Sequence, residues 1–326
     1  MAPSALQPPT RLTPTAALAL SQQAPAILRR SVSTAYPPPL NKLLSGSETS
    51  DKWLQYENLI QSCLRTGDDQ AAHACLKRLT VRFGDHNERV QALRGLVKEA
   101  EARNNGELEE VLKEYNQILS GNGTNIPITK RRIALLRSMG RLSDATSALV
   151  QLLDFSPTDA EAWSELSAIY LSQGLYPQAI YAMEEVLVLA PNAWNIHARL
   201  GELQYMAATA PGVANGSSQQ YMAEAIRRFS RSIELCDDYL RGYYGLKLVT
   251  RKLLSEGAKA AKQTEDSELT LPDTNTIERL NELATAKLSD IVRHSASHDR
   301  GWRGYSEAEI AAARDLLGED RSPTTR

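Results

Sequence analysis

Apolar residues along much of this chain recur three or four positions apart, which is the spacing of helices that bury one face. The pattern is clearest in residues 160–193, where Trp163, Leu166 and Tyr170 form a single stripe. Gly174 interrupts the stripe, and glycine commonly ends a helix because it adopts a positive φ without strain. The pattern therefore predicts a helix that ends near Gly174 and a second helix after it.

The second helix is bounded by Pro191, because proline rarely continues a helix. It contains Ala179, whose small side chain lets two helices approach closely. This order of Trp, Leu, Tyr, Gly, Ala and Pro resembles the tetratricopeptide repeat, a pair of antiparallel helices of about 34 residues. One such pair buries its apolar face only against the next pair, so the resemblance implies an array of repeats.

Two further copies keep much of this order. Residues 126–159 match in the second helix but lack the tryptophan, and a copy that starts at Trp53 ends with Gly84 in place of proline. The residues predicted to pack the repeats are Tyr56, Ala72, Gly140, Ala145, Pro157, Trp163, Leu166, Tyr170, Gly174, Ala179 and Pro191.

Three weaker copies require changes of length. Residues 87–125 fit if the turn between the helices, predicted at Asn104–Gly106, is longer than usual. A copy that starts at Trp194 fits with an inserted surface loop at Ala207–Gln220, a segment rich in Ala, Gly, Ser and Asn.

The last copy opens at Leu240, runs into a polar loop at residues 259–271 and resumes as a helix at Thr274–Arg293. The sequence therefore predicts an all-α fold, a right-handed tetratricopeptide-repeat superhelix (α-solenoid) of about six helix pairs. We assign this repeat domain to residues 48–294.

Residues 1–47 differ from the repeats in composition. They hold eight of the fifteen prolines and no Asp or Glu. An acid-poor segment with arginine and serine is typical of a mitochondrial presequence, which would be cleaved near Arg29–Ser31. The alternative is a disordered, Pro-rich arm with one short helix, Pro14–Gln23, capped by Thr13. Its apolar residues Leu18, Leu20 and Ile27 could dock on the repeats or on a partner.

Residues 295–326 form a tail beyond the repeats. Ser306–Glu309 has the sequence of a capping box, which predicts a short helix that ends at Gly318. We expect this helix, on a mobile tail, to cover the exposed face of the last repeat.

Composition excludes several classes of function. The 326 residues carry a net charge of −2, and no domain-wide basic excess indicates a nucleic-acid partner. No apolar run is long enough to span a membrane. The three cysteines, Cys63, Cys75 and Cys236, are predicted to be buried free thiols in a reducing compartment.

The sequence contains no recognisable catalytic motif. His294 and His298 are four residues apart, which zinc accepts on a helix, but no Cys, Asp or Glu cluster completes a tetrahedral set. Phosphate-binding loops and nucleophile motifs are also absent. We predict no active site, no cofactor and no metal.

The main polar feature is a basic cluster made of Lys130, Arg131, Arg132, Arg137 and Arg141. Lys130 and Arg137 take positions 5 and 12 of their repeat, which face the concave groove in tetratricopeptide proteins, whereas Arg131 and Arg132 lie off that face. The cluster is either a solvated basic face or a binding site for an acidic helix or peptide of a partner.

Co-chaperones of this fold bind a C-terminal carboxylate with Lys and Asn residues at positions 5 and 9 of successive repeats. Here those positions hold Gln91 and Gly95, Lys130 and Ala134, Ser164 and Ala168, and Ala198 and Glu202. The clamp residues are therefore missing, and a co-chaperone adaptor is the alternative interpretation.

Residues 124–170, TNIPITKRRIALLRSMGRLSDATSALVQLLDFSPTDAEAWSELSAIY, resemble the central region of the subunit 2 family of the endoplasmic reticulum membrane protein complex. A basic first helix, a glycine turn, an alanine-containing second helix and an EAW-x-EL-x-x-x-Y unit occur there in this order. The resemblance extends more weakly from about Trp53 to Arg293, and the two long loops depart from it in length.

This resemblance implies a non-catalytic scaffold in a hetero-oligomer with other subunits of that complex. The complex inserts tail-anchored and multi-pass proteins into the membrane, and its subunit 2 organises the cytosolic segments of other subunits. The implied location is the cytoplasmic face of the endoplasmic reticulum membrane. A mitochondrial assembly factor is the further alternative.

Overall fold

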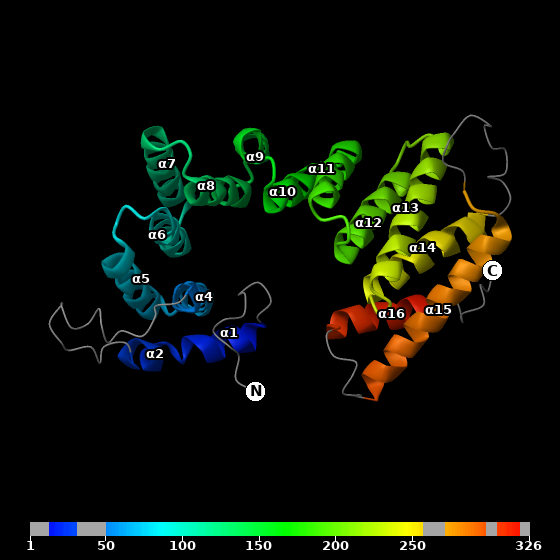
Figure 1. Ribbon diagram of the computed structural model, residues 1–326, viewed down its shortest axis with the longest axis horizontal. Helices are drawn as coiled ribbons and strands as arrows, with labels where there is room; N and C mark the ends of the chain where they lie inside the picture. The colour runs from blue at the N-terminus through cyan, green and yellow to red at the C-terminus, as the bar shows by residue number, and fades with distance from the viewer. Residues whose placement is uncertain (1–12, 31–49, 257–270, 298–304, 320–326) are drawn as a thin grey trace. The chain divides into compact units, whose positions relative to one another are not determined.

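The computed structural model describes residues 13–30, 50–256, 271–297 and 305–319, and their regular secondary structure is entirely α-helical (Figure 1). The chain divides into two compact units, residues 1–152 and 153–326. Each unit is described by itself below.

The helices of the first unit are α1 (Pro14–Ser21), α2 (Ala24–Arg30), α4 (Ser50–Thr66), α5 (Asp69–Phe83), α6 (Glu88–Glu101), α7 (Asn105–Gly121), α8 (Ile126–Ser138) and α9 (Leu142–Phe155), the last of which continues into the second unit. Helices that follow one another pack together: α4 on α5, α5 on α6, and α6 on both α7 and α8. The core at the beginning of this unit includes Leu59, Ile60, Cys63, Cys75 and Leu79.

Glycine turns repeat between the paired helices. Gly140 has a φ of +75°, and behind it the amide of Arg141 donates to the carbonyl of Leu136 at 2.9 Å. In the second unit, Gly174 has a φ of +73° and the amide of Leu175 donates to the carbonyl of Tyr170, also at 2.9 Å. Both turns are Schellman motifs, in which the left-handed glycine lets two amides satisfy the last helical carbonyls. The predicted repeat length and tetratricopeptide-type helix pairs are therefore confirmed.

The repeat predicted at residues 87–125, with a lengthened turn between its helices, differs from the prediction. The turn between its helices is short, because α7 already begins at Asn105, where the side chain of Asn104 accepts a hydrogen bond from the amide of Glu107 at 3.0 Å. The additional residues lengthen α6 and α7 instead of the turn. Sequence reasoning took Asn104–Gly106 for a loop, although an Asn also caps helices well.

Two short helices near the N-terminus pack on the first repeat, α1 on α4 and α2 on α5. Thr13 caps α1 as predicted, and its hydroxyl accepts from the amide of Ala16 at 3.2 Å. The expected helix ends at Ser21, earlier than predicted, and α2 was not expected. Leu20 is fully buried, whereas Leu18 is half exposed. The remainder of residues 1–47 lies outside the described part of the chain.

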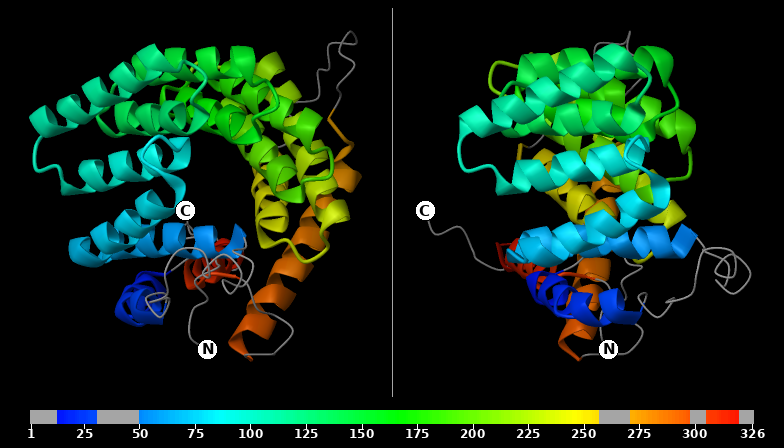
Figure 2. Two further views of the ribbon diagram at one scale, coloured as in Figure 1. Left: turned by 60° about the vertical axis from the view of Figure 1, so that its left-hand side comes forward. Right: turned by 90° about the vertical axis from the view of Figure 1, so that its left-hand side faces the viewer.

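The helices of the second unit are α10 (Ala160–Ser172), α11 (Tyr176–Leu189), α12 (Trp194–Thr209), α13 (Asn215–Leu235), α14 (Leu240–Glu256), α15 (Thr274–Ala296) and α16 (Glu307–Glu319). Again each helix packs on the next, and α14 lies beside the long α15, drawn in orange in Figure 2. Phe229, Tyr243, Leu246 and Leu288 are among the core residues that join α13, α14 and α15.

The predicted loop at Ala207–Gln220 is mostly helical. Helix α12 continues to Thr209 and α13 starts at Asn215, so few residues connect them. Ala207 is buried, and the hydroxyl of Ser218 donates to the carbonyl of Ala208 at 2.8 Å. The prediction was wrong because alanine favours a helix when neighbouring helices bury it. Helix α15 begins at Thr274 as predicted, whereas residues 257–270 lie outside the described part of the chain.

The C-terminal helix α16 belongs to the packed core of the second unit. Its capping box is present: the amide of Ser306 donates to Glu309 at 2.9 Å, and the amide of Glu309 donates to the Ser306 hydroxyl at 3.2 Å. Ile310 and Ala313 are buried against this core, so α16 does cover the last repeat and the expected mobility does not hold for it. Gly318 is not a C-cap, because the helix continues to Glu319.

Candidate partner-binding surfaces

Among the described residues, no three His, Cys, Asp or Glu side chains come together as metal ligands. His298 lies outside this part of the chain, so the His294 pair is not tested. Of the helices in the described ranges, none combines the length and the apolar character that a bilayer span requires.

Helix α8 carries most of the basic cluster. Asn125 caps it by accepting from the amide of Ile128 at 3.1 Å. Ile128 and Ile133 are fully buried and thereby fix which residues of α8 point outward. In this register Arg137 is exposed and Lys130 is half-buried.

Arg131 has a structural role inside the first unit. Its guanidinium forms a two-point ion pair with Glu99 of α6, and the hydroxyl of Tyr115 on α7 donates to the same carboxylate. Burial alone would lower the pKa of the Arg131 guanidinium. The negative charge of Glu99 and its hydrogen bonds to Arg131 outweigh burial, so the pKa of Arg131 is raised. Burial, followed by the charge of Glu99, raises the pKa of the Tyr115 phenol. These residues therefore link α6, α7 and α8.

The ring of Tyr115 lies against Gly95 on α6. A Cβ atom added to Gly95 would be 2.1 Å from the Tyr115 Oη and 2.4 Å from its Cε1. Position 9 of this repeat is thus filled by a side chain of the next helix. Sequence analysis missed this contact, and its only signal was a glycine in the middle of a helix.

The other two members of the basic cluster are Arg132 and Arg141. Arg132 is half-buried, and its Nε has no hydrogen-bond partner among the described residues. Arg141 pairs with Asp144 at 2.7 Å and with Glu109 at 3.3 Å, next to the glycine turn. Arg131 and Arg141 thus form ion pairs within the first unit, and a groove-facing position stays a prediction for Lys130 and Arg137.

Several of the predicted packing residues are buried or hydrogen-bonded. Ala72, Ala145 and Ala179 are fully buried. The indole of Trp163 donates to the carbonyl of Pro157 at 2.8 Å. Leu166 is buried, Tyr56, Trp163 and Tyr170 are half-buried, and the carbonyl of Pro191 is 2.9 Å from the His197 Nε2.

The second unit contains a hollow of about 290 Å³ between α12, α14 and α16. Tyr205, Tyr239 and Tyr244 line it together with Ala198 and Glu202. Counted from Trp194, Ala198, Glu202 and Tyr205 are positions 5, 9 and 12. In this repeat, the positions that sequence analysis assigned to the groove do line a hollow.

The floor of this hollow, which we call the tyrosine hollow, depends on close packing. Phe229 lies against Gly245, where an added Cβ would be 2.1 Å from the Phe229 Cε1. At the rim, Arg241 of α14 pairs with Glu309 of α16 at 2.7 Å. Sequence analysis missed this site because its wall includes α16, a helix distant in sequence.

The protein family described as "EMC2 TPR-like repeat domain" matches residues 85–219 of this chain. TPR repeat protein oca3 of Schizosaccharomyces pombe is 31% identical over 247 residues, which cover 74% of this chain and 83% of that protein. ER membrane protein complex subunit 2-A of Xenopus laevis is 31% identical over 219 residues, covering 67% of this chain and 68% of that protein.

A more distant relative has the same name. ER membrane protein complex subunit 2 of Saccharomyces cerevisiae is 25% identical over 202 residues, covering 60% of this chain and 68% of that protein. The matched family region includes α8 with its basic residues, the Gly140 and Gly174 turns and the Trp163 repeat. The chain belongs to the ER membrane protein complex subunit 2 family, whose tetratricopeptide-type repeats form its helix pairs.

Proposed function

We propose that this protein is a non-catalytic scaffold subunit of the endoplasmic reticulum membrane protein complex. It works at the cytoplasmic face of the membrane and is held there by other subunits. By organising their cytosolic segments, it supports the insertion of tail-anchored and multi-pass proteins. The named relatives support membership of the complex.

The observation that carries the scaffold role is the tyrosine hollow. Its wall consists of groove positions of one repeat, and tyrosine combines a large apolar ring with a polar tip. Aromatic residues of this kind are enriched where proteins bind other proteins. We assign the hollow to an apolar side chain of a partner segment.

Co-purification from detergent-solubilised membranes tests the hollow. The double variant Tyr205→Ala/Tyr244→Ala removes two half-buried rings from its wall, and we expect recovery of the other subunits to fall severalfold. Tyr176→Ala is the control, because Tyr176 is a half-buried tyrosine on α11 of the same unit and does not line the hollow. Unchanged recovery with the double variant, at wild-type helicity, would refute the role of the hollow.

The basic helix is tested separately by Lys130→Glu/Arg137→Glu. A matched control is Arg103→Glu/Lys113→Glu, which makes the same change of charge at exposed positions of the same unit. If α8 sets the register of a partner, only the first pair weakens co-purification. Equal loss with both pairs would indicate a general effect of charge.

Two alternatives have less support. The co-chaperone clamp residues are missing from positions 5 and 9, and at Gly95 the position is occupied by Tyr115. A mitochondrial assembly factor would lose its leader near Arg29–Ser31, yet Leu20 and Ala24 pack into the core of the first unit. Microscopy with and without residues 1–47 separates the locations.

A further inference from the structure

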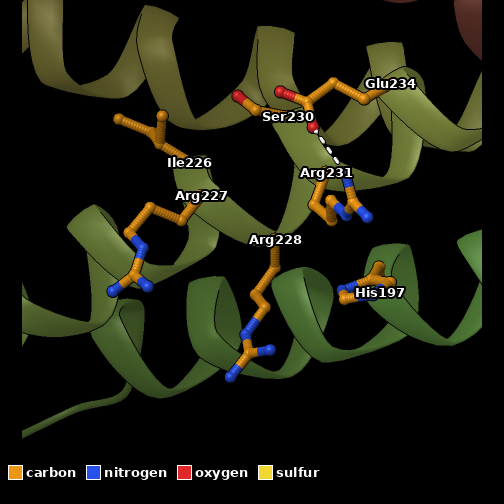
Figure 3. Close-up of a pocket in the computed structure, with 7 residues that line it drawn as sticks. All are labelled: His197, Ile226, Arg227, Arg228, Ser230, Arg231 and Glu234. Atoms are coloured by element: carbon orange, nitrogen blue, oxygen red, sulfur yellow. Dashed lines mark hydrogen bonds and ion pairs between the residues drawn. The ribbon is translucent and has the colours of Figure 1, made fainter. Parts of the chain in front are cut away.

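A second hollow, of about 380 Å³, lies where α13 passes over α12 (Figure 3). Its lining includes His197 of α12 and Arg227, Arg228 and Arg231 of α13. We call it the arginine pocket. None of these residues belongs to the tyrosine hollow, so the two sites have separate linings.

The arginines retain unused hydrogen-bond donors. Each one contacts carboxylates through a single nitrogen: Arg227 pairs with Glu224 at 3.0 Å, Arg228 with Glu184 at 3.1 Å, and Arg231 with Glu234 at 3.1 Å. A guanidinium has five N–H donors and binds carboxylates best through two of them. The Nε of Arg228 is moreover buried and has no partner among the described residues.

His197 adds an unsatisfied buried group. Its side chain is more than nine-tenths buried, and its Nε2 donates to the carbonyl of Pro191 at 2.9 Å. The proton therefore resides on Nε2, which leaves Nδ1 as an acceptor in the neutral ring. Nδ1 is buried and has no hydrogen-bond partner among the described residues. A buried acceptor without a partner costs free energy, so a ligand that donates a hydrogen bond to Nδ1 would be stabilised.

A peptide satisfies both kinds of group at once. A side-chain carboxylate accepts from the guanidiniums, and a backbone N–H donates to the His197 Nδ1. A free carboxylate such as acetate offers the first interaction but has no N–H or O–H donor for the second. The neighbouring α11 also presents Tyr181 and Val188, 58% and 72% exposed, on the helical stripe that carries Glu184, the partner of Arg228.

We propose that the arginine pocket binds an acidic, extended segment of a partner protein, with a carboxylate on Arg228 and Arg231 and an adjacent apolar side chain on Tyr181 and Val188. Glu184, Glu224 and Glu234 already offset much of the local positive charge. The pocket consequently recognises the peptide through directed hydrogen bonds more than through long-range electrostatic attraction. This function is additional to the proposed scaffold role and does not depend on it.

The test uses the purified full-length chain and a fluorescent synthetic peptide that alternates Glu or Asp with Leu. Its control peptide has Gln and Asn at the acidic positions. We expect the acidic peptide to bind, the amide peptide not to bind, and Arg228→Gln/Arg231→Gln to weaken binding about tenfold. His197→Gln keeps a donor for Pro191 but removes Nδ1, and it weakens binding as well.

Arg293→Gln is the matched control, because Arg293 of α15 pairs with Asp290 as Arg231 does with Glu234 but lines neither hollow. It leaves peptide binding unchanged. No binding by the wild-type chain, equal binding of the two peptides, or an equal effect of Arg293→Gln would each overturn the proposal. Loss of binding to phosphatidylserine vesicles in the Arg228/Arg231 variant, with peptide binding intact, would assign the pocket to a membrane surface instead.

Discussion

Replacing Gly95 by alanine tests whether close packing or helix propensity has the larger effect on the stability of the first unit. In an exposed helix this substitution stabilises by about 1 kcal/mol, since alanine is the better helix former. Gly95, however, faces the ring of Tyr115, and a Cβ there would lie 2.1 Å from its Oη, 2.4 Å from Cε1 and 2.6 Å from Cζ. Tyr115 is 1% exposed and cannot move aside without disturbing the core.

The size of the effect follows from two costs. Overpacking a core costs about 1–3 kcal/mol. Displacing Tyr115 also breaks its hydrogen bond to the Glu99 carboxylate, and a bond to a charged group is worth about 1.5–3 kcal/mol. After subtraction of the gain in helix propensity, we expect Gly95→Ala to lower the free energy of unfolding by about 2–5 kcal/mol.

Urea denaturation followed by circular dichroism measures this loss, and hydrogen exchange of peptides from α6 to α8 localises it. Gly121→Ala in the same unit is the control, because nothing lies within 4 Å of the Cβ it would add. In a Tyr115→Leu background, which removes the three clashing atoms, Gly95→Ala should cost less than in the wild type. A Gly95→Ala protein as stable as the wild type would refute the reasoning.

Two other predictions concern titratable groups. Burial raises the pKa of the Cys63 and Cys75 thiols to about 12. A thiol reagent at pH 8 should therefore modify the half-buried Cys236 first and leave Cys63 and Cys75 unreacted until the first unit unfolds. Equal reaction rates for all three cysteines would contradict the packing. At Glu309, burial would raise the carboxyl pKa, but the Ser306 amide and Arg241 outweigh it and hold the pKa below its ordinary value of 4.5. Because the folded-state pKa is the lower one, this stabilisation of α16 is present above pH 4.5 and is lost as the pH falls through the folded-state value. The hydrogen-exchange protection of α16, corrected for the intrinsic pH dependence of amide exchange, should thus fall in acid in the wild type and change less in Arg241→Gln.

Local signals made much of the fold predictable. A glycine at the turn, an alanine in the second helix and a polar residue before a helix each act within a few residues of chain. Gly140, Gly174 and Ala179 could therefore be assigned from the sequence, and the structure shows the positive φ or the full burial that each one implied. The capping box at Ser306 is equally local.

Errors arose where burial by a distant segment outweighed local preference. Ala207 lies in a stretch whose composition indicates a loop, but packing of α12 on α13 keeps it helical. Likewise, sequence reasoning grouped Arg131 with the other basic residues. The structure pairs it with Glu99 on another helix, an interaction that no spacing along α8 could reveal.

The sequence by itself determined the period of the repeats and the family, and it predicted which positions of a repeat face a groove. Only the tertiary structure decided which of those positions remain open: Tyr115 fills the space at Gly95, whereas the hollow beside Tyr205 is left accessible. It also brought His197 and the arginines of α13 together. The physical reason is that helix formation depends on neighbours along the chain, while the shape and charge of a binding site depend on side chains that meet only after the helices have packed.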